Sequence, residues 1–528
     1  MMISLYRSSV KHCTGIYFRK NEIFMRQFSL FLKGTLILTF ASLLSRFLGF
    51  FYKIFLAQAL GAEGMGIYQL IFPVFAVCHA LTASGLEVAI SRFTAFHKKE
   101  EHVSFLHAGL FLSMTASLAI SSVLWCQSSF VSIHLLHEAR CAPLLRIIAA
   151  VIPLSAVHCC FAGFYLGKKK ASIPAGAQLL EQTLRIGAVW LLCNIYTQQG
   201  RTISPSLAAF GLLAGEAASA LFMLTVSNES RPRLRYFHVY ISRCRTLLGM
   251  AVPLTGTRLS LSLLQSMEAV LIPLSLRQSG LTSAEALSMY GILTGMSLSF
   301  LMFPNAVTSS ISAMLLPVIS EEQAQGNKKN ISVAIEYTIL FGLIIGILFM
   351  GIFLRYGIAL GTVIFHEQLA GEFLATLAWI CPFLYFTGNL NSILHGLGNT
   401  RITFRNQLAA ILVRILFILF FVPVHGIKGV LWGLLASQFL LCLLGIRAIS
   451  AHISPTLGLD TLILRPLAAI TLATGGMELF RHLPSAFRLG TGLLTLAVNI
   501  CIMAVIYFIL LFLFGIHKLI HLPVLQKR

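Results

Sequence analysis

The residues with the clearest chemical potential are charged side chains placed inside long apolar stretches. Arg46 and Lys53 lie seven residues apart in the first such stretch. Seven residues turn a helix through about 700°, close to two full turns, so both cations share one helical face. A charge at the centre of a membrane helix costs about 2.5–3.5 kcal/mol, and it usually faces a polar cavity or a partner. The spacing therefore predicts a cationic wall, which suits a pyrophosphate group because Arg binds it bidentately.

The same spacing occurs a second time, in the seventh apolar stretch. Arg258 and Gln265 repeat it there. We expect Arg46, Lys53, Arg258 and Gln265 to line one anion-binding substrate cavity. For Lys53 a second interpretation stays open, because it lies near the end of its stretch and its ammonium group can extend to the membrane surface.

A secondary set of polar residues also lies within apolar stretches. Glu181 and Arg185 are four residues apart, which is the spacing of an intrahelical ion pair. Arg185 and Arg414 have a structural alternative, in which backbone carbonyls satisfy their guanidinium groups. Glu216 is a further acid outside the set. The set consists of Glu87, Gln178, Glu181, Arg185, Glu268, Gln407 and Arg414.

Composition defines the elements that must position these residues. Of 528 residues, 57% are hydrophobic and 11% are charged, against about 25% charged in soluble proteins. We expect an all-α polytopic membrane protein, in which spans of about 20 residues cross the hydrocarbon core. Reading runs bounded by charge, Gly or Pro gives fourteen spans: 34–58, 66–91, 103–126, 144–166, 173–196, 205–226, 247–276, 287–318, 331–356, 371–396, 401–423, 426–448, 460–480 and 489–514.

The net charge of +21 is mostly a signal of orientation. With the N-terminus inside, the cytoplasmic tails and loops hold 25 Lys or Arg residues and the opposite side holds seven. Such a bias over short loops follows the positive-inside rule. It predicts that both termini are cytoplasmic, and it leaves little reason to expect a nucleic-acid partner, even for the basic loop 231–245.

An internal repeat suggests two lobes. A shift of 229 residues superposes 163–186 on 392–415, which places Gln178 on Gln407 and Arg185 on Arg414. A six-helix unit in two parallel copies predicts a cavity between lobes and alternating access. The expected organisation is a tail (1–33), an N-lobe (34–238), a C-lobe (239–450) and a C-terminal part with spans 13 and 14 (451–528).

Several motifs resemble the polysaccharide and oligosaccharide flippases of the multidrug/oligosaccharidyl-lipid/polysaccharide exporter superfamily, with the branch of stage V sporulation protein B the most similar. The resemblance covers about residues 30–515. It implies a two-lobed transporter that flips or exports a lipid-linked glycan precursor of the cell wall or of a polysaccharide across the cytoplasmic membrane. A role in spore envelope synthesis stays open at this point. The motifs are Ser45–Lys53, Leu60–Tyr68, Ala89–Arg92, Leu316–Glu321 and Asn391–Gly398.

The resemblance to lipid II flippases is more distant. Their opening Ser-Arg-x-Leu-Gly-Phe is present and supports Arg46 as a cavity residue. The other arginines of those flippases are absent here. The next one is replaced by Tyr52, those of the second span fall near Val77 and Cys78, and the one of the eighth span falls near Ser299. These departures place lipid II itself in doubt as the substrate.

The sequence offers no catalytic constellation. It lacks a Gly-x-x-x-x-Gly-Lys-Ser/Thr loop and an Asp-x-Asp pair, so we expect neither an ATPase nor a glycosyltransferase. No cofactor or metal site is expected. Expected partners are the bilayer, an anionic lipid-linked glycan, and glycosyltransferases or envelope-assembly proteins.

Some alternatives remain open. A cation-coupled multidrug exporter of the same fold and a scaffold for envelope assembly without transport both fit the span pattern. Met25 is an alternative start to Met1, and Cys126 and Cys141 flank one loop in which they can pair.

Overall fold

The structure is a computed structural model that describes residues 2–97, 99–227, 237–309, 328–450, 458, 460–481 and 492–516. These residues form helices joined by short turns, and none of them forms a strand. The predicted all-α polytopic class is confirmed.

The first helix, α1 (Met2–His79), changes direction at Gly61. The backbone there has φ of 67° and ψ of 179°, a conformation that glycine adopts without steric cost. The bend separates the first two predicted spans, which form one continuous run through η1 (Ala80–Ser84) and α2 (Gly85–Phe96). The predicted tail 1–33 is also helical from Met2 onward.

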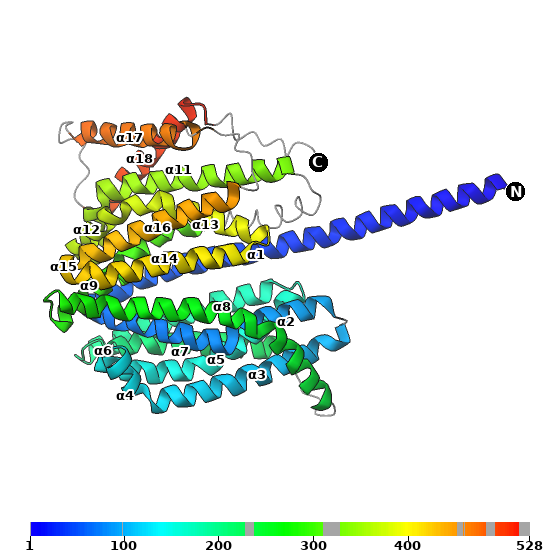
Figure 1. The fold of residues 1–528 in the computed structure, drawn as a ribbon, viewed down its shortest axis with the longest axis horizontal. Coiled ribbons are helices and arrows are strands. Elements are labelled where there is room, and N and C mark those ends of the chain that lie inside the picture. Colours follow the sequence, from blue (N-terminus) through cyan, green and yellow to red (C-terminus); the bar gives the residue numbers. More distant parts are fainter. Residues whose placement is uncertain are drawn as a thin grey trace.

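The helices that follow pack in the same order in both halves of the chain. The first half ends at residue 226 and the second half begins at residue 237. α6 (Ser172–Gln198) packs on α1 and α7 (Pro205–Val226), and α14 (Thr400–Phe420) packs correspondingly on α8 (Phe237–Gln278) and α16 (Ile427–Ser450). α3 (Lys99–Cys126) packs on α5 (Ala142–Gly167) as α11 (Lys328–Leu360) packs on α13 (Cys381–Gly396). In Figure 1, α1 runs between the group that holds α2–α8 and the group that holds α11–α18.

The bounds of the elements after α2, in chain order, are as follows. In the first half they are α3 (Lys99–Cys126), α4 (Ser128–Phe130), η2 (Val131–Leu135), η3 (Ala139–Cys141), α5 (Ala142–Gly167), α6 (Ser172–Gln198) and α7 (Pro205–Val226). Next come α8 (Phe237–Gln278), α9 (Ser283–Gly291), η5 (Ile292–Ser297), a helical stretch over 298–309, α11 (Lys328–Leu360), η6 (Gly361–Phe365), α12 (Gln368–Leu377) and η7 (Ala378–Ile380). The last are α13 (Cys381–Gly396), α14 (Thr400–Phe420), α15 (Val422–His425), α16 (Ile427–Ser450), η8 (Asp460–Leu464), α17 (Arg465–Arg481) and α18 (Leu493–Leu513).

Among the described residues, 11 helical segments are long and apolar enough to cross a membrane. The sequence predicted fourteen. The first two predicted spans form one segment, Ile37–Phe96. α6 and α17 do not reach the same apolarity because they carry charged side chains, such as Glu181 and Arg185 in α6. The predicted end of span eight, 310–318, lies outside the described residues.

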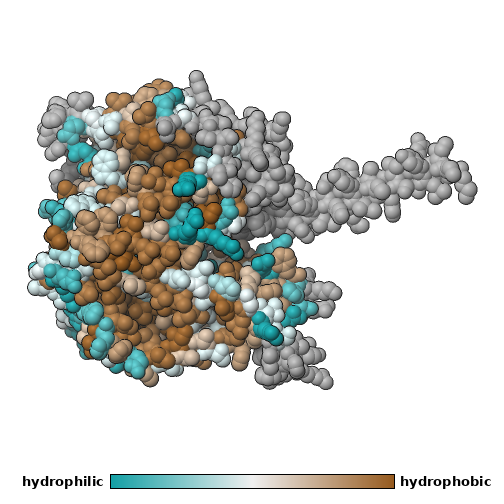
Figure 2. Space-filling model, viewed as in Figure 1, coloured by the Kyte–Doolittle hydropathy of each residue, from teal (hydrophilic) through white to brown (hydrophobic). Residues whose placement is uncertain are grey.

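The outer surface of the helices is apolar, as a lipid-facing surface must be. Figure 2 shows hydrophobic residues over much of the middle of one face, with hydrophilic residues along its left edge and others toward its right side. Phe40, Phe111 and Leu513 are each more than 60% exposed. Many other large apolar side chains are also exposed. Such a surface is unfavourable in water and fits contact with the hydrocarbon core of a membrane.

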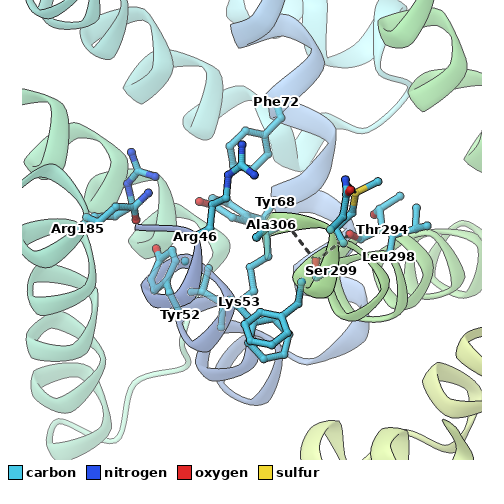
Figure 3. A pocket seen from close by; sticks show the side chains of 17 residues that line it. Arg46, Tyr52, Lys53, Tyr68, Phe72, Arg185, Thr294, Leu298, Ser299 and Ala306 are labelled. Atoms are coloured by element: carbon cyan, nitrogen blue, oxygen red, sulfur yellow. Dashed lines mark hydrogen bonds between the residues drawn. The ribbon is translucent and has the colours of Figure 1, made fainter. Parts of the chain in front are cut away.

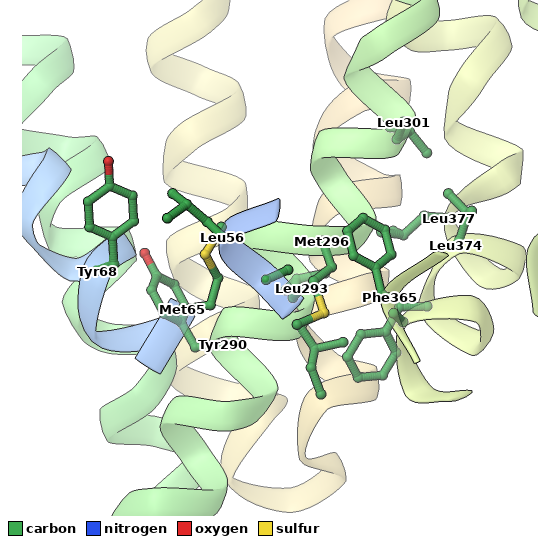
Figure 4. Packing of buried hydrophobic residues seen from close by; sticks show 14 of the residues in the cluster. Leu56, Met65, Tyr68, Tyr290, Leu293, Met296, Leu301, Phe365, Leu374 and Leu377 are labelled. Carbon is green, nitrogen blue, oxygen red and sulfur yellow. The ribbon is translucent and has the colours of Figure 1, made fainter. Parts of the chain in front are cut away.

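The two halves meet in a tightly packed apolar cluster. Leu56 and Met65 of α1 lie against Leu293 and Met296 of η5 (Figure 4), and all four are at most 1% exposed. Tyr290 closes the same cluster from α9. α1 thus holds the bundle together, because it packs against elements of both halves.

Two glycines allow the closest approach within this contact. A Cβ atom on Gly66 would lie 2.1 Å from the backbone oxygen of Leu287, and a Cβ atom on Gly291 would lie 2.2 Å from that of Ala62. Small residues let membrane helices approach until backbone and side-chain atoms pack directly.

We expect Gly66→Ala to lower the melting temperature of the purified protein. The added methyl group has no room, and overpacking of this kind costs about 1–3 kcal/mol. Gly256→Ala is the matched control, since a Cβ atom there meets nothing within 4 Å. Equal melting temperatures for the two variants would contradict the close contact of α1 and α9.

Candidate functional site

A cavity of about 600 Å³ lies where α1, α6 and the segment 292–309 meet. Its wall contains three cationic side chains, Arg46 and Lys53 from α1 and Arg185 from α6. In Figure 3 these side chains approach the cavity from two helices, with Ser299 on the opposite side. We call it the cationic pocket. Its full lining is Arg46, Gly49, Phe50, Tyr52, Lys53, Leu56, Tyr68, Phe72, Gln182, Arg185, Thr294, Leu298, Ser299, Met302, Phe303, Asn305 and Ala306.

The two cations of α1 bind hydroxyl groups of the other half of the chain. Arg46 Nη1 donates to Ser309 Oγ at 2.5 Å, and Lys53 Nζ donates to Ser299 Oγ at 3.1 Å. Lys53 is therefore directed into the pocket and not toward the membrane surface. Within the described part of the chain neither cation has a carboxylate partner. Each retains charge that an anion can neutralise.

Aromatic side chains share the pocket wall with these cations, of which Arg46 is exposed and Lys53 is partly buried. Phe50 packs on Phe303 with ring centroids 4.4 Å apart and on Phe300 at 4.9 Å. Tyr52 is buried, and its hydroxyl group is an electrostatic neighbour of Tyr68, which also lines the pocket. Apolar walls of this kind reduce dielectric screening and strengthen the attraction between the cations and a bound anion.

The third cation also belongs to a second set of charged groups. Arg185 pairs with Glu181 one helical turn away, as the sequence spacing allowed. His158 of α5 lies 3.9 Å from Glu181 and 3.3 Å from Glu216 of α7, between nitrogen Nδ1 and a carboxylate oxygen in each case. We call His158, Glu181 and Glu216 the carboxylate–histidine cluster. The nitrogen and oxygen atoms of these three residues that could bind a metal ion lie within 4.8 Å of one another. The guanidinium group of Arg185 beside them opposes a metal cation there.

The other predicted residues occupy separate places. Arg258 and Gln265 are exposed on α8 and do not line the cationic pocket. Glu87, on α2, is partly buried and is an electrostatic neighbour of Arg258. The repeat therefore does not bring both halves of the predicted cavity set into this pocket.

The remaining members of the secondary set lie at helix contacts. Gln178 accepts a hydrogen bond from Ser42 at 3.2 Å, which joins α6 to α1. Arg414 of α14 pairs with Glu268 of α8 at 3.2 Å. Gln407 is partly buried on α14.

Sequence reasoning missed several polar partners. Ser299 and Ser309 received no role as ligands, although hydroxyl groups in an apolar stretch were a usable signal. His158 was also missed, because a single histidine in an apolar span gives no periodic pattern. Cys126 and Cys141, for which a pair was an alternative, are both free.

A separate ionic network joins the bend of α1 to the end of α8. Arg140 bonds Glu63 and Glu138 at 2.7 Å each, and Arg277 donates to the His137 carbonyl at 3.2 Å. Burial raises the pKa of Glu138, but hydrogen bonds from Arg140 and the charges of Arg140 and Arg277 outweigh it, so this pKa lies below its usual range. The network therefore stabilises the fold above the ordinary Glu pKa and loses that contribution as the pH falls through the lowered value.

Comparisons with known proteins agree with this geometry. A family model described as "Polysaccharide biosynthesis protein" matches residues 31–323, and a model described as "MatE" matches 262–420. The chain is 28% identical over 434 residues to "Stage V sporulation protein B" of Bacillus subtilis (strain 168), which covers 80% of this chain and 83% of the relative. It is 22% identical over 424 residues to "Lipid II flippase MurJ" of the same organism, covering 73% and 76%.

A solved structure shares the fold. It is "Lipid II flippase MurJ, inward closed conformation", with a TM-score of 0.73 and 15% sequence identity, and the match covers 92% of this chain and 100% of the other. The helices described above therefore follow a known transporter fold.

We expect Arg414→Met to destabilise the protein because it leaves Glu268 charged and unpaired within the bundle. Removing one partner of a buried pair costs about 3–5 kcal/mol, whereas replacing both partners with apolar residues is often neutral. The melting temperature should fall for Arg414→Met and recover in Arg414→Met/Glu268→Met. Asp460→Asn, at the exposed acidic end of the pair with Arg465, is the control and should change it little. A stable but inactive Arg414→Met would contradict a structural role for this pair.

Proposed function

This chain belongs to the polysaccharide biosynthesis protein family, and from that premise we propose that it carries an anionic lipid-linked glycan precursor across the cytoplasmic membrane. The observation that supports this most directly is the cationic pocket. Arg46, Lys53 and Arg185 converge on one cavity at the contact between the halves of the chain. A pyrophosphate link between lipid and sugar is the part of such a substrate that these groups recognise.

The dimensions of the pocket fit a headgroup and not a complete lipid. Ligand pockets commonly measure about 300–1,000 Å³, and the cationic pocket measures about 600 Å³. The lipid chain of the substrate would then remain in the bilayer. Relatives named as a lipid II flippase and as a sporulation protein support a precursor of the cell wall or spore envelope as the substrate class.

We propose alternating access as the transport mechanism. The bonds of Arg46 to Ser309 and of Lys53 to Ser299 cross from one half of the chain to the other. Separation of the halves would therefore break these bonds and open the pocket. The proposed lobes are 34–238 and 239–450, flanked by 1–33 and 451–528, and the basic loops favour cytoplasmic termini.

A multidrug exporter of the same fold is the second candidate, and the MatE match over 262–420 favours it. A cationic drug, however, would meet three cations in the pocket. Glycosyltransferases or envelope-assembly proteins are proposed neighbours of the transporter, because they would supply or use a glycan precursor.

We expect Arg46→Gln and Lys53→Gln to reduce flipping of a fluorescent polyprenyl-pyrophosphate glycan in proteoliposomes. A hydrogen bond to a charged group contributes about 1.5–3 kcal/mol, which corresponds to about 10–150-fold in affinity. Arg401→Gln, an exposed position outside the pocket, is the control for loss of a positive charge. Unchanged flipping by both pocket variants at normal protein levels would refute the proposed anion site.

A crosslink between the halves should distinguish a carrier from a scaffold. Gln58 of α1 donates to the Ile364 carbonyl of η6 at 2.7 Å. In a cysteine-free background, Gln58→Cys/Ile364→Cys joined by a reducible bismaleimide should stop flipping, and reduction should restore it.

The control crosslink joins Arg355→Cys to Glu478→Cys, two positions within the second half of the chain. We expect it to leave flipping intact. Full activity in both crosslinked proteins would argue against movement of the halves.

A further inference from the structure

The carboxylate–histidine cluster is a buried charged site adjoining the cationic pocket. Its members come from three successive helices, α5, α6 and α7. Glu181 and Glu216 are 9% and 8% exposed. His158 Nδ1 lies at hydrogen-bond distance, 3.3 Å, from Glu216 Oε2. Carboxylates are rarely buried within a membrane bundle without a functional reason.

The charges around this cluster do not balance. In formal charges, three carboxylates (Glu87, Glu181 and Glu216) face two guanidinium groups (Arg185 and Arg258). One negative charge remains when all three carboxylates are ionised and His79 and His158 are neutral. An unpaired charge in a low-dielectric interior is costly, so the arrangement favours one added positive charge. The titratable and charged groups that face the cluster from the packed elements are Tyr52, Tyr68 and His79 of α1, Glu87 of α2, His158 and Cys159 of α5, Glu181 and Arg185 of α6, Glu216 of α7 and Arg258 of α8.

Arg185 connects the cluster to the pocket. Its guanidinium group pairs with Glu181, while its side chain also lines the cationic pocket. Its Nε has no hydrogen-bond partner among the residues that the structure describes. A single guanidinium group thus has two possible anionic partners, the Glu181 carboxylate and an anion in the pocket.

We propose that the cluster takes up one proton when a pyrophosphate group enters the cationic pocket. The proton comes from the buffered aqueous solution and is held on His158, between its Nδ1 and the Glu216 carboxylate. Protonated His158 then replaces Arg185 as the cationic partner of Glu181, which lies 3.9 Å from the same nitrogen. Arg185 becomes available to the anion. This inference rests on the proposed function, because it requires an anion in the pocket.

The linkage works in both directions. If protonation of the cluster raises the affinity of the pocket for an anion, anion binding must raise the affinity of the cluster for a proton by the same factor. The adjoining guanidinium group already places a positive charge beside Glu181, so a proton suits the cluster better than a metal ion. The proton also reduces by one the negative charge that each substrate brings into the membrane.

Titration calorimetry of the full-length protein in detergent tests this proposal. The ligands are farnesyl pyrophosphate, which carries a lipid chain, and inorganic pyrophosphate, which does not. Buffers with different ionisation enthalpies report the protons taken up on binding. We expect uptake approaching one proton for each anion bound by the wild-type protein, and tighter binding of farnesyl pyrophosphate if the lipid headgroup is the natural source of the anion.

The pH dependence of the affinity for the anion shows whether protonation of the cluster strengthens or weakens anion binding. We expect anion affinity to fall by about 5–150-fold, the usual range of coupling between sites, from about pH 5.5 to about pH 8, either side of the ordinary histidine pKa of about 6.5. The ligand itself becomes more anionic over this range, which would strengthen binding. A fall in affinity therefore reports the protein and not the ligand.

Two variants of the cluster make the test specific. Glu181→Gln releases Arg185 permanently, so it should bind the anion at high pH as tightly as wild type does at low pH. Glu216→Gln removes the excess negative charge of the cluster. This variant should bind the anion without proton uptake by the protein, so that only proton exchange of the ligand remains. The control is Glu372→Gln, an exposed position on α12, and it should behave as wild type.

The outcomes separate the two proposals. Anion binding without proton uptake, or a Glu181→Gln variant with the pH profile of wild type, would overturn the proton linkage alone. Addition of Na⁺ or Zn²⁺ at high pH would also overturn it if the wild-type protein then bound the anion as tightly as it does at low pH. A metal cation, and not a proton, would then supply the added positive charge of the cluster. Absence of any anion binding by the wild-type protein would overturn the proposed function together with this inference.

Discussion

The structure depends on how it accommodates positive charge inside the hydrocarbon layer. Arg46 and Lys53 cannot face lipid without a penalty of about 2.5–3.5 kcal/mol each. Both are directed instead toward hydroxyl groups of the opposite half of the chain. α1 must therefore lie between the halves, and it packs on α6 on one side and on α9 on the other. Hydroxyl groups solvate these cations without neutralising them. The fold thus keeps positive charge available at the contact between its halves.

The glycine contact near Gly66 and Gly291 serves the same arrangement. Close packing there brings the second part of α1 against α9, and the cationic pocket lies directly beside this contact because Leu56 and Tyr68 belong both to the buried cluster and to the pocket wall. Backbone atoms meet directly at this point, and the buried side chains of Leu56, Met65, Leu293 and Met296 pack around them. The contact therefore fixes the position of α1, and with it the position of Arg46 and Lys53.

Part of this was predictable from the sequence. Composition and run length gave the class, and the spacing of Arg46 and Lys53 gave their shared face, because both follow from the geometry of one helix. The same spacing in Arg258 and Gln265 predicted a shared cavity, but the structure places them outside the pocket. Periodicity determines which residues share a helical face and not what lies opposite that face. α8 faces α2, α3 and α14 as well as α1.

Contacts between helices explain why the carboxylate–histidine cluster was not predicted as a unit. Its three members are separated by more than twenty residues from one to the next, and only tertiary packing brings them together. Arg185 takes part in both sites. It forms an ion pair with Glu181 within α6, and its side chain also lines the cationic pocket. On the proposed function, an anion in the pocket would compete with Glu181 for that guanidinium group, so binding there would alter the charge balance of the buried site beside it.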